Sequence, residues 1–163
     1  MAVQRNGAEF LDKLAETSEP IDLYQHDYYA WVCTQVEALR EHKVAALDWE
    51  NLAEEVEDLG KAERHRLESH LEGLMMHLLK WRYQPQRRSR SWTYSIKEHR
   101  FRIRKVLRDN PSLKSALVPI LADAYEGARI SAENETGMDP SVFPESCPWS
   151  AEDSIRDDFW PEA

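Results

Sequence analysis

The sequence predicts an all-α fold, an up-down bundle of four main helices followed by an irregular C-terminal strap rich in proline and tryptophan. Three observations support this prediction. Apolar residues recur at spacings of three and four, which is the pattern of helices with one buried face. Only five glycines are present, so the positive-φ turns that hairpins need are few. Charged residues make up 31% of the chain, as expected for helices with solvated outer faces.

The chain is expected to form a single helical domain over residues 1–163, because this length suffices for one sizeable core. Residues 1–20 show no strong apolar periodicity, so we expect a loosely ordered arm there. The strap at residues 138–163 contains four prolines, which exclude a long helix, and four large aromatic residues, which argue against disorder. We expect this strap to pack on the bundle, with one short helix near 151–156.

Capping residues and helix breakers give the helix boundaries. Asp27, Asp48 and Ser91 are suitable N-caps, because their side-chain oxygens can accept hydrogen bonds from free backbone N–H groups. Pro85 ends the longest helix near residue 83, and Gly137 is suited to a C-cap. The four main helices are therefore expected at residues 28–42, 49–83, 92–109 and 116–136.

The longest helix carries an apolar stripe that we expect to be buried. At 3.6 residues per turn, one face collects Leu52, Val56, Leu59, Leu67, Leu74 and Trp81. Gly60 is the weak point of the helix and is expected to mark a kink or a close helix crossing. Beyond Gly73 the helix is apolar nearly all round, so this half should be the most enclosed part of the protein.

A buried polar seam is predicted within this stripe, formed by Glu55, Glu63, Arg66, His70 and His77. Buried charges are costly unless paired, so these residues need partners from other helices. One hypothesis makes them a metal or acid/base site inside a bundle. The hypothesis we favour is structural, because the chain has no Glu-x-x-His, HExxH or paired-cysteine motif. No metal ligand, cofactor or catalytic residue is assigned.

Residues 80–108 form a strongly basic segment, with eleven Lys or Arg and one acid, whereas the other 134 residues hold ten bases and 29 acids. Basic residues with exposed aromatic residues suit phosphate-rich or single-stranded nucleic acids. The interpretation we favour is that the basic residues neutralise acids of the same chain or of another subunit. The candidate partner-binding residues are Arg87, Arg88, Arg90, Tyr94, Lys97, Phe101, Arg104 and Arg108.

Several classes of protein are disfavoured. The net charge of −9 is unlike that of a simple polyphosphate binder. The chain lacks a GxSxG motif and a glycine-rich phosphate loop. Two cysteines do not indicate a disulfide framework, and we expect both to be reduced and largely buried. No apolar run has the length of a signal peptide or a membrane span, so we expect a cytoplasmic protein.

The strings HLLKW, QPQRRSRSW, CPW and FWP, with the opening segment DLYQHDYYAW, are unusual. Together they resemble the bacterial domain-of-unknown-function family 29, in the family's order and over nearly the whole chain after about residue 22. The resemblance implies a small bacterial all-helical protein, and it brings no known activity or catalytic residue. The polar and aromatic positions that match are Asn51, Glu54, Glu55, His77, Lys80, Gln84, Arg87 and Trp92.

From these observations we expect a non-enzymatic binding or regulatory protein that acts through a protein–protein contact, with a protein partner or a second copy of the chain. Two alternatives remain open. One is nucleic-acid binding through the basic segment 80–108. The other is an enzyme or metal site at the Glu/His line of the longest helix.

Overall fold

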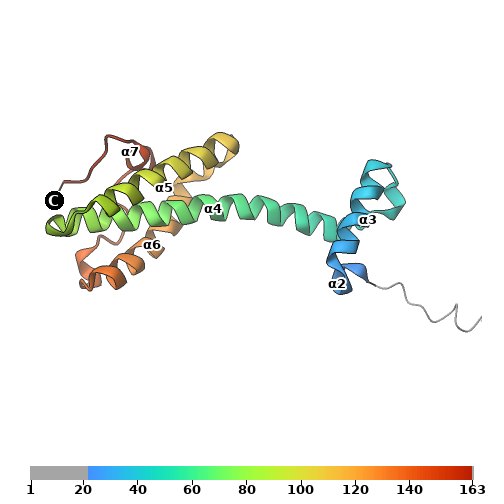
Figure 1. The fold of residues 1–163 in the computed structure, drawn as a ribbon, viewed down its shortest axis with the longest axis horizontal. Helices are drawn as coiled ribbons and strands as arrows, with labels where there is room; N and C mark the ends of the chain where they lie inside the picture. Colours follow the sequence, from blue (N-terminus) through green and yellow to red (C-terminus); the bar gives the residue numbers. More distant parts are fainter. Residues whose placement is uncertain (1–21, 163) are drawn as a thin grey trace, which may run out of the picture. The chain divides into compact units, whose positions relative to one another are not determined.

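The computed structural model describes residues 22–162, so the expected arm at residues 1–20 lies outside the described residues. The described chain consists of helices and connecting loops, and it contains no strand (Figure 1). Within it, no helix combines the length and apolar character that a membrane crossing requires. The α-helices are α2 (Leu23–His26), α3 (Tyr28–Arg40), α4 (Trp49–Tyr83), α5 (Arg90–Asp109), α6 (Leu117–Thr136) and α7 (Ala151–Ile155).

Four short 3₁₀ helices lie in the connections, at Val44–Ala46, Pro85–Arg87, Pro111–Ala116 and Pro140–Val142. The prediction of an all-α fold with four long helices is confirmed, since α3, α4, α5 and α6 match the expected elements closely. Asp27 caps α3, and Gly137 ends α6 with a φ of 67°. The short helix α7 is capped by Ser150, while α5 begins earlier than expected because Ser89 caps it.

The contacts divide the chain into two compact units, whereas the sequence suggested a single domain. One unit ends at Val56 and the other begins at Glu57, so α4 starts in the first unit and continues into the second. We call the described residues 22–56 the first unit and residues 57–162 the second unit. The division arises because each part has its own set of packed side chains, described separately below.

The first unit is organised around Trp31, whose ring contacts the rings of Tyr24 and Tyr28. Its indole Nε1 donates a hydrogen bond of 3.0 Å to Asp48, the residue before α4. Asp48 also accepts a bond from the Asn51 backbone N–H at 3.3 Å, which caps α4 as expected. In α3 the buried residues are Trp31, Gln35 and Ala38. A few aromatic contacts and hydrogen bonds therefore hold this unit together.

The second unit has an apolar core, made by α4 beyond residue 66 with α5 and α6. The helix directions follow from contacts between them: Glu63 bonds Asn110 at the end of α5, and Arg64 bonds Asp123 near the start of α6. Helix α5 therefore runs antiparallel to α4, and α6 runs parallel to it (Figure 1). The most enclosed residues include Leu67, Leu71, Leu74, Met75, Leu78, Leu79, Ile96, Ile103, Ile120, Ala128 and Ala132.

The C-terminal strap packs on the second unit, as expected from its aromatic residues. Phe143 is buried against Tyr83, and the Trp160 ring lies 4.6 Å from that of Trp81. The fully buried guanidinium of Arg100 donates hydrogen bonds to the backbone carbonyls of Ser154, Asp157 and Phe159. A cation on α5 thus satisfies carbonyl groups in a segment that has little helix of its own.

Two expectations about α4 are wrong. The apolar stripe is buried only from Leu67 onward, because Val56 and Leu59 are 65% and 70% exposed. The close helix crossing lies at Gly73, where a Cβ would meet the His99 ring, and Gly60 has no neighbour within 4 Å. Helix α4 is continuous through Gly60, so this glycine interrupts nothing.

Candidate functional site

Three histidines form a row between α4 and α5. The ring of His99, from α5, lies with its centroid 5.8 Å from that of His70 and 6.0 Å from that of His77, both on α4. Gly73 permits this arrangement, because a Cβ at that position would lie 2.4 Å from the His99 ring. The sequence pattern placed His70 and His77 on one line and His99 on the buried face of the next helix, but it did not predict their grouping.

Burial lowers the pKa of every histidine in this row. For His77 the pKa falls to about 4, first through desolvation and then through the charge of Lys80. Desolvation is also the main cause for His70 and His99. The Nδ1 atoms of His77 and His99 are buried and find no hydrogen-bond partner in the described part of the chain. At neutral pH the row therefore consists of uncharged imidazoles.

The other members of the predicted buried polar seam do not continue this row. Glu55 belongs to the first unit, where it accepts hydrogen bonds from the hydroxyls of Tyr24 and Tyr28 at 2.9 and 2.8 Å. Glu63 is half-buried and pairs with Arg66, whose side chain is exposed. The prediction of one continuous buried seam is thus wrong. Between residues 22 and 162, no group of three or more acidic, histidine or cysteine side chains is arranged to hold a metal ion.

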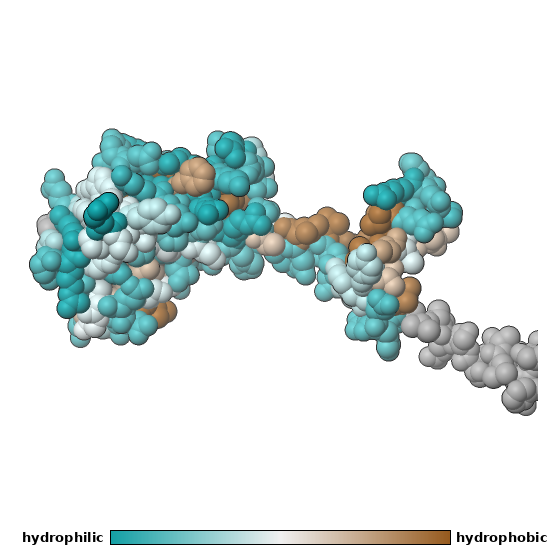
Figure 2. Space-filling view, viewed as in Figure 1, coloured by the Kyte–Doolittle hydropathy of each residue, from teal (hydrophilic) through white to brown (hydrophobic). Residues whose placement is uncertain are grey.

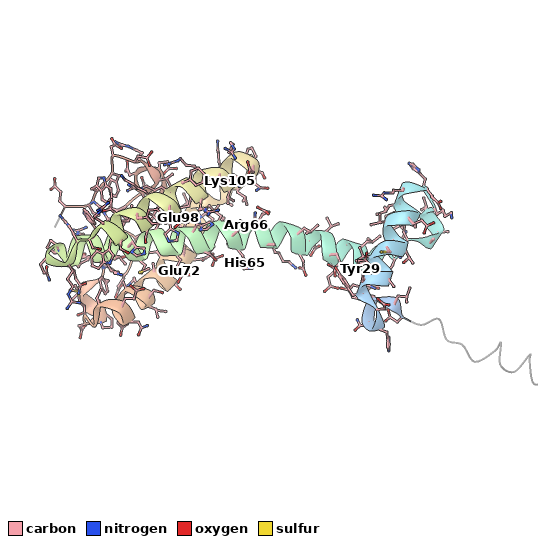
Figure 3. The ribbon with its side chains drawn as sticks, in the orientation of Figure 1. Tyr29, His65, Arg66, Glu72, Glu98 and Lys105 are labelled. Atoms are coloured by element: carbon pink, nitrogen blue, oxygen red, sulfur yellow. The ribbon has the colours of Figure 1, made fainter. Side chains whose placement is uncertain are left out.

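A polar cavity of about 550 Å³ lies between α4 and α5, beyond the His70 end of the histidine row. Figure 3 labels Arg66 on α4 and Glu98 on α5. Helix α4 contributes Glu63, Arg66 and His70 to the cavity. Helix α5 and its C-cap contribute Arg102, Lys105, Val106, Asp109 and Asn110.

The predicted partner-binding residues on the basic segment are all exposed, including the aromatic side chains of Tyr94 and Phe101. Three of them also make internal contacts, and two of these, Arg104 and Arg108, pair with the acids Asp157 and Asp109. Arg88 lies over the Trp81 ring and donates to its backbone carbonyl, and Arg104 pairs with Asp157 of the strap. The charged members that make no such contact with the strap or with α4 are Arg87, Arg90, Lys97 and Arg108.

Sequence reasoning did not assign structural or site roles to several other basic residues. Lys80 is buried, forms an ion pair with Glu135 and lies over the Trp92 ring. Arg100 is fully buried beneath the strap. The positions of Arg100 and Arg102 on one helix, two residues apart, put the first on the buried face and the second at the cavity. In this cation-rich segment the sequence gave no signal to tell them apart.

Exposed apolar residues are concentrated in the first unit and the adjoining turns of α4. Figure 2 shows hydrophobic surface in this part of the chain. On α3, a shallow groove of about 580 Å³ is lined by Val32, Cys33, Val36, Glu37, Arg40 and Glu41; we call it the α3 groove. Cys33 is exposed, contrary to expectation, whereas Cys147 is half-buried and burial raises the pKa of its thiol.

The sequence model of the family described as Domain of unknown function DUF29 matches residues 23–160 of this chain. No curated protein and no solved structure shows a significant match. The family match therefore extends from the start of α2 to Trp160 of the strap and covers residues of both units.

Proposed function

Because the chain belongs to the DUF29 family, whose function is unknown, we propose a function from its own surface: a non-enzymatic protein that binds a partner through the first unit. The partner we infer is a basic amphipathic helix of another protein. The observation that carries this proposal is the exposure of large apolar side chains on a unit of only 35 described residues.

The exposed side chains include Tyr29 at 79% and Trp49 at 60%. Single exposed apolar residues are ordinary on protein surfaces, but a cluster of them marks an interaction site. On α3, Tyr29, Val32 and Val36 are separated by three and four residues, so they lie along one face of the helix. This face offers an apolar stripe beside the α3 groove.

The charge of the first unit supports a basic partner. Residues 22–56 hold eight acids and two Lys or Arg. Glu37 and Glu41 line the α3 groove together with Arg40, so its lining has one negative charge in excess. An amphipathic helix places its apolar side chains in such a groove, and cations on its flanks would meet these carboxylates.

Cys33 provides a direct readout of docking in the α3 groove. In a Cys147→Ser chain, Cys33 is the single remaining thiol, and its reaction rate with a chromogenic disulfide reports its accessibility. As the probe we suggest a peptide with the sequence of residues 90–109, which is basic and carries apolar residues at helical spacing. We expect the peptide to slow the reaction at least about tenfold at saturation, because a docked helix covers the thiol.

Two controls separate docking from charge attraction. A scrambled peptide of the same composition should leave the Cys33 rate unchanged, since it has the charge without the apolar face. Tyr29→Ser and Val36→Ser should abolish protection, whereas Val118→Ser, at a residue 71% exposed in the second unit, should retain it. Equal protection by both peptides would overturn the proposal. So would sedimentation data showing a homodimer that buries Cys33 and excludes the peptide.

The nucleic-acid alternative has weaker support, because Arg88 and Arg104 of the basic segment already contact Trp81 and the strap. It stays a hypothesis about the exposed remainder of that segment. Binding to single-stranded nucleic acid would weaken steeply with salt, and Arg87→Ala would reduce it.

A further inference from the structure

We propose that the polar cavity between α4 and α5 is a binding site for a small phosphate ester, with Arg66, Arg102 and Lys105 as the residues that hold its phosphate. This site lies wholly within the second unit and does not depend on the function proposed for the first unit. Its volume of about 550 Å³ exceeds what a bare phosphate needs and falls within the range typical of small-molecule sites.

The carboxylates at the cavity already have partners. Glu63 accepts hydrogen bonds from Arg66 at 3.2 Å and from the side-chain amide of Asn110 at 3.0 Å. Asp109 accepts one from the neighbouring Arg108 at 3.0 Å. Their negative charge is therefore largely compensated before any ligand arrives.

The cations are less completely paired. Lys105 makes no ion pair with any residue in the range 22–162 and is exposed at the mouth of the cavity (Figure 3). Arg102 has a single ion-pair contact, to Glu98 at 3.5 Å, and Arg66 directs one terminal nitrogen to Glu63. Each guanidinium has five N–H donors, so both arginines retain donors for a phosphate. One positive charge without a counterion therefore remains at this site.

The C-terminal end of α5 lies at the cavity, and the carbonyl of Val106 there has hydrogen-bond partners of its own. A helix C-terminus carries partial negative charge on its free carbonyls, which would repel an anion. Here the side-chain amide and the backbone N–H of Asn110 both donate to the carbonyl of Val106, at 3.3 and 2.8 Å. One of the free carbonyls at the cavity is thus already occupied.

The positive charges at the cavity affect the pKa of His70. After burial, the charges of Arg102 and Arg66 are the next causes that lower its pKa, and Glu98 opposes them. A bound dianion would reverse this balance and raise the pKa of His70. The pKa of His70 therefore reports whether an anion binds in the cavity. If the arginines had a purely structural role, adding the ester would leave this pKa unchanged.

The carboxylates indicate what the phosphate is attached to. Glu63 and Asp109 present acceptor oxygens beside the cations, and hydroxyl groups of a ligand are suitable donors to them. The chemical class that suits both features is the phosphate ester of a small polyol or sugar. Inorganic phosphate would use the cations alone and should bind more weakly.

The test uses calorimetry on the full chain with ribose 5-phosphate, glycerol 3-phosphate and inorganic phosphate, and with ribose as the uncharged control. We expect saturable binding of both esters, weaker binding of inorganic phosphate, and none of ribose. Lys105→Gln and Arg102→Gln should each weaken ester binding about tenfold or more, since each removes a charge-assisted contact worth more than ~1.4 kcal/mol. Both side chains are exposed, so the fold should be retained.

Lys97→Gln is the matched control, because Lys97 is an exposed lysine of α5 that does not line the cavity. We expect unchanged affinity in this variant. Nuclear magnetic resonance should show the His70 pKa rising when the ester binds. Absence of saturable binding at millimolar ester would overturn the proposal. Equal weakening by Lys97→Gln, or an unmoved His70 pKa, would do the same, because either result means diffuse attraction to the basic surface.

Discussion

The two units of this chain differ strongly in how completely they bury their apolar side chains. The second unit encloses leucine, isoleucine and alanine side chains from three long helices, and the strap covers Phe143 and Trp160. In the first unit, α3 buries Trp31, Gln35 and Ala38. The described residues of this unit are held by the aromatic contacts of Trp31 and by hydrogen bonds such as the one from Trp31 to Asp48.

The contrast is clearest within a single helix. Leu59 and Leu67 lie on the same stripe of α4, yet the first is 70% exposed and the second is fully buried. Nothing local distinguishes these positions, because both are leucines in regular helix. The burial of a leucine on this stripe therefore depends on whether α5 and α6 pack against that part of α4. It also identifies the first unit as the part of the chain with apolar surface left for a partner.

The substitution with the largest expected effect tests whether the strap contributes to the stability of the second unit. Arg100→Met removes a fully buried cation and leaves the carbonyls of Ser154, Asp157 and Phe159 without a donor. We expect a loss of about 3–5 kcal/mol in the free energy of unfolding, measured with urea. Hydrogen exchange around Trp31 should be unchanged, since that residue is in the first unit.

The control for this variant is Arg104→Met, whose side chain is exposed, pairs with Asp157 and donates one hydrogen bond to the carbonyl of Ile155. A surface pair contributes roughly 0–1 kcal/mol, so this change should be mild. If both variants cost the same, the buried guanidinium is not what holds the strap.

A pair of leucine substitutions sharpens the comparison within α4. Leu67→Ala should lower the free energy of unfolding by about 2–5 kcal/mol, because it creates a cavity in the core. Leu59→Ala should change it by less than about 0.5 kcal/mol, because the side chain is exposed. Urea denaturation of the two variants gives the measurement, and a large cost at Leu59 would mean that this leucine is covered in solution.

Alanine substitutions at the two glycines of α4 should change the stability in opposite directions. Gly73→Ala should destabilise the second unit by about 1–3 kcal/mol, because the new methyl group overlaps the His99 ring. Gly60→Ala meets no neighbouring atom and should stabilise α4 by about 0.5–1 kcal/mol, since alanine favours helix. Thermal unfolding followed by circular dichroism distinguishes the two. Adding His99→Ala to Gly73→Ala should recover part of the loss, and its failure to do so would place the strain elsewhere.

The histidine row makes the stability of the second unit depend on pH in the acidic range. The pKa of His77 is lowered from 6.5 to about 4, so the unfolded chain binds a proton more readily than the folded chain between these values. The stabilisation is therefore complete above about pH 6.5 and is lost as the pH falls toward 4. The slope should reach at most about 1.4 kcal/mol per pH unit for each histidine.

Urea titrations at several pH values measure this slope, and His77→Gln should reduce it. The groups near His77 are Lys80 and His99, which lower its pKa, and Glu135, which raises it. His65→Gln is the control, because His65 is exposed and outside the row. An unchanged slope in His77→Gln would show that other groups govern the acid sensitivity.

Much of the candidate site could be predicted from the sequence. The outward face of α5, with Tyr94 and Phe101, was predicted and is exposed. His70 and Glu63 were singled out by their seven-residue spacing, and both line the cavity. Arg102 and Asn110 were not singled out for any site, because their meeting with α4 depends on how two helices cross. A dense run of cations cannot indicate which of its members face a cavity and which bind the strap.

The sequence by itself determined the four long helices and most of their ends. Caps such as Asp27, Asp48 and Gly137 act on backbone groups a few residues away, so their effect can be read without knowing the fold. Only the tertiary structure decided which half of the α4 stripe is buried, that Gly73 rather than Gly60 receives another helix, and that Arg100 lies beneath the strap. These outcomes depend on packing between segments far apart in sequence, and a local pattern contains no information about which segments will meet.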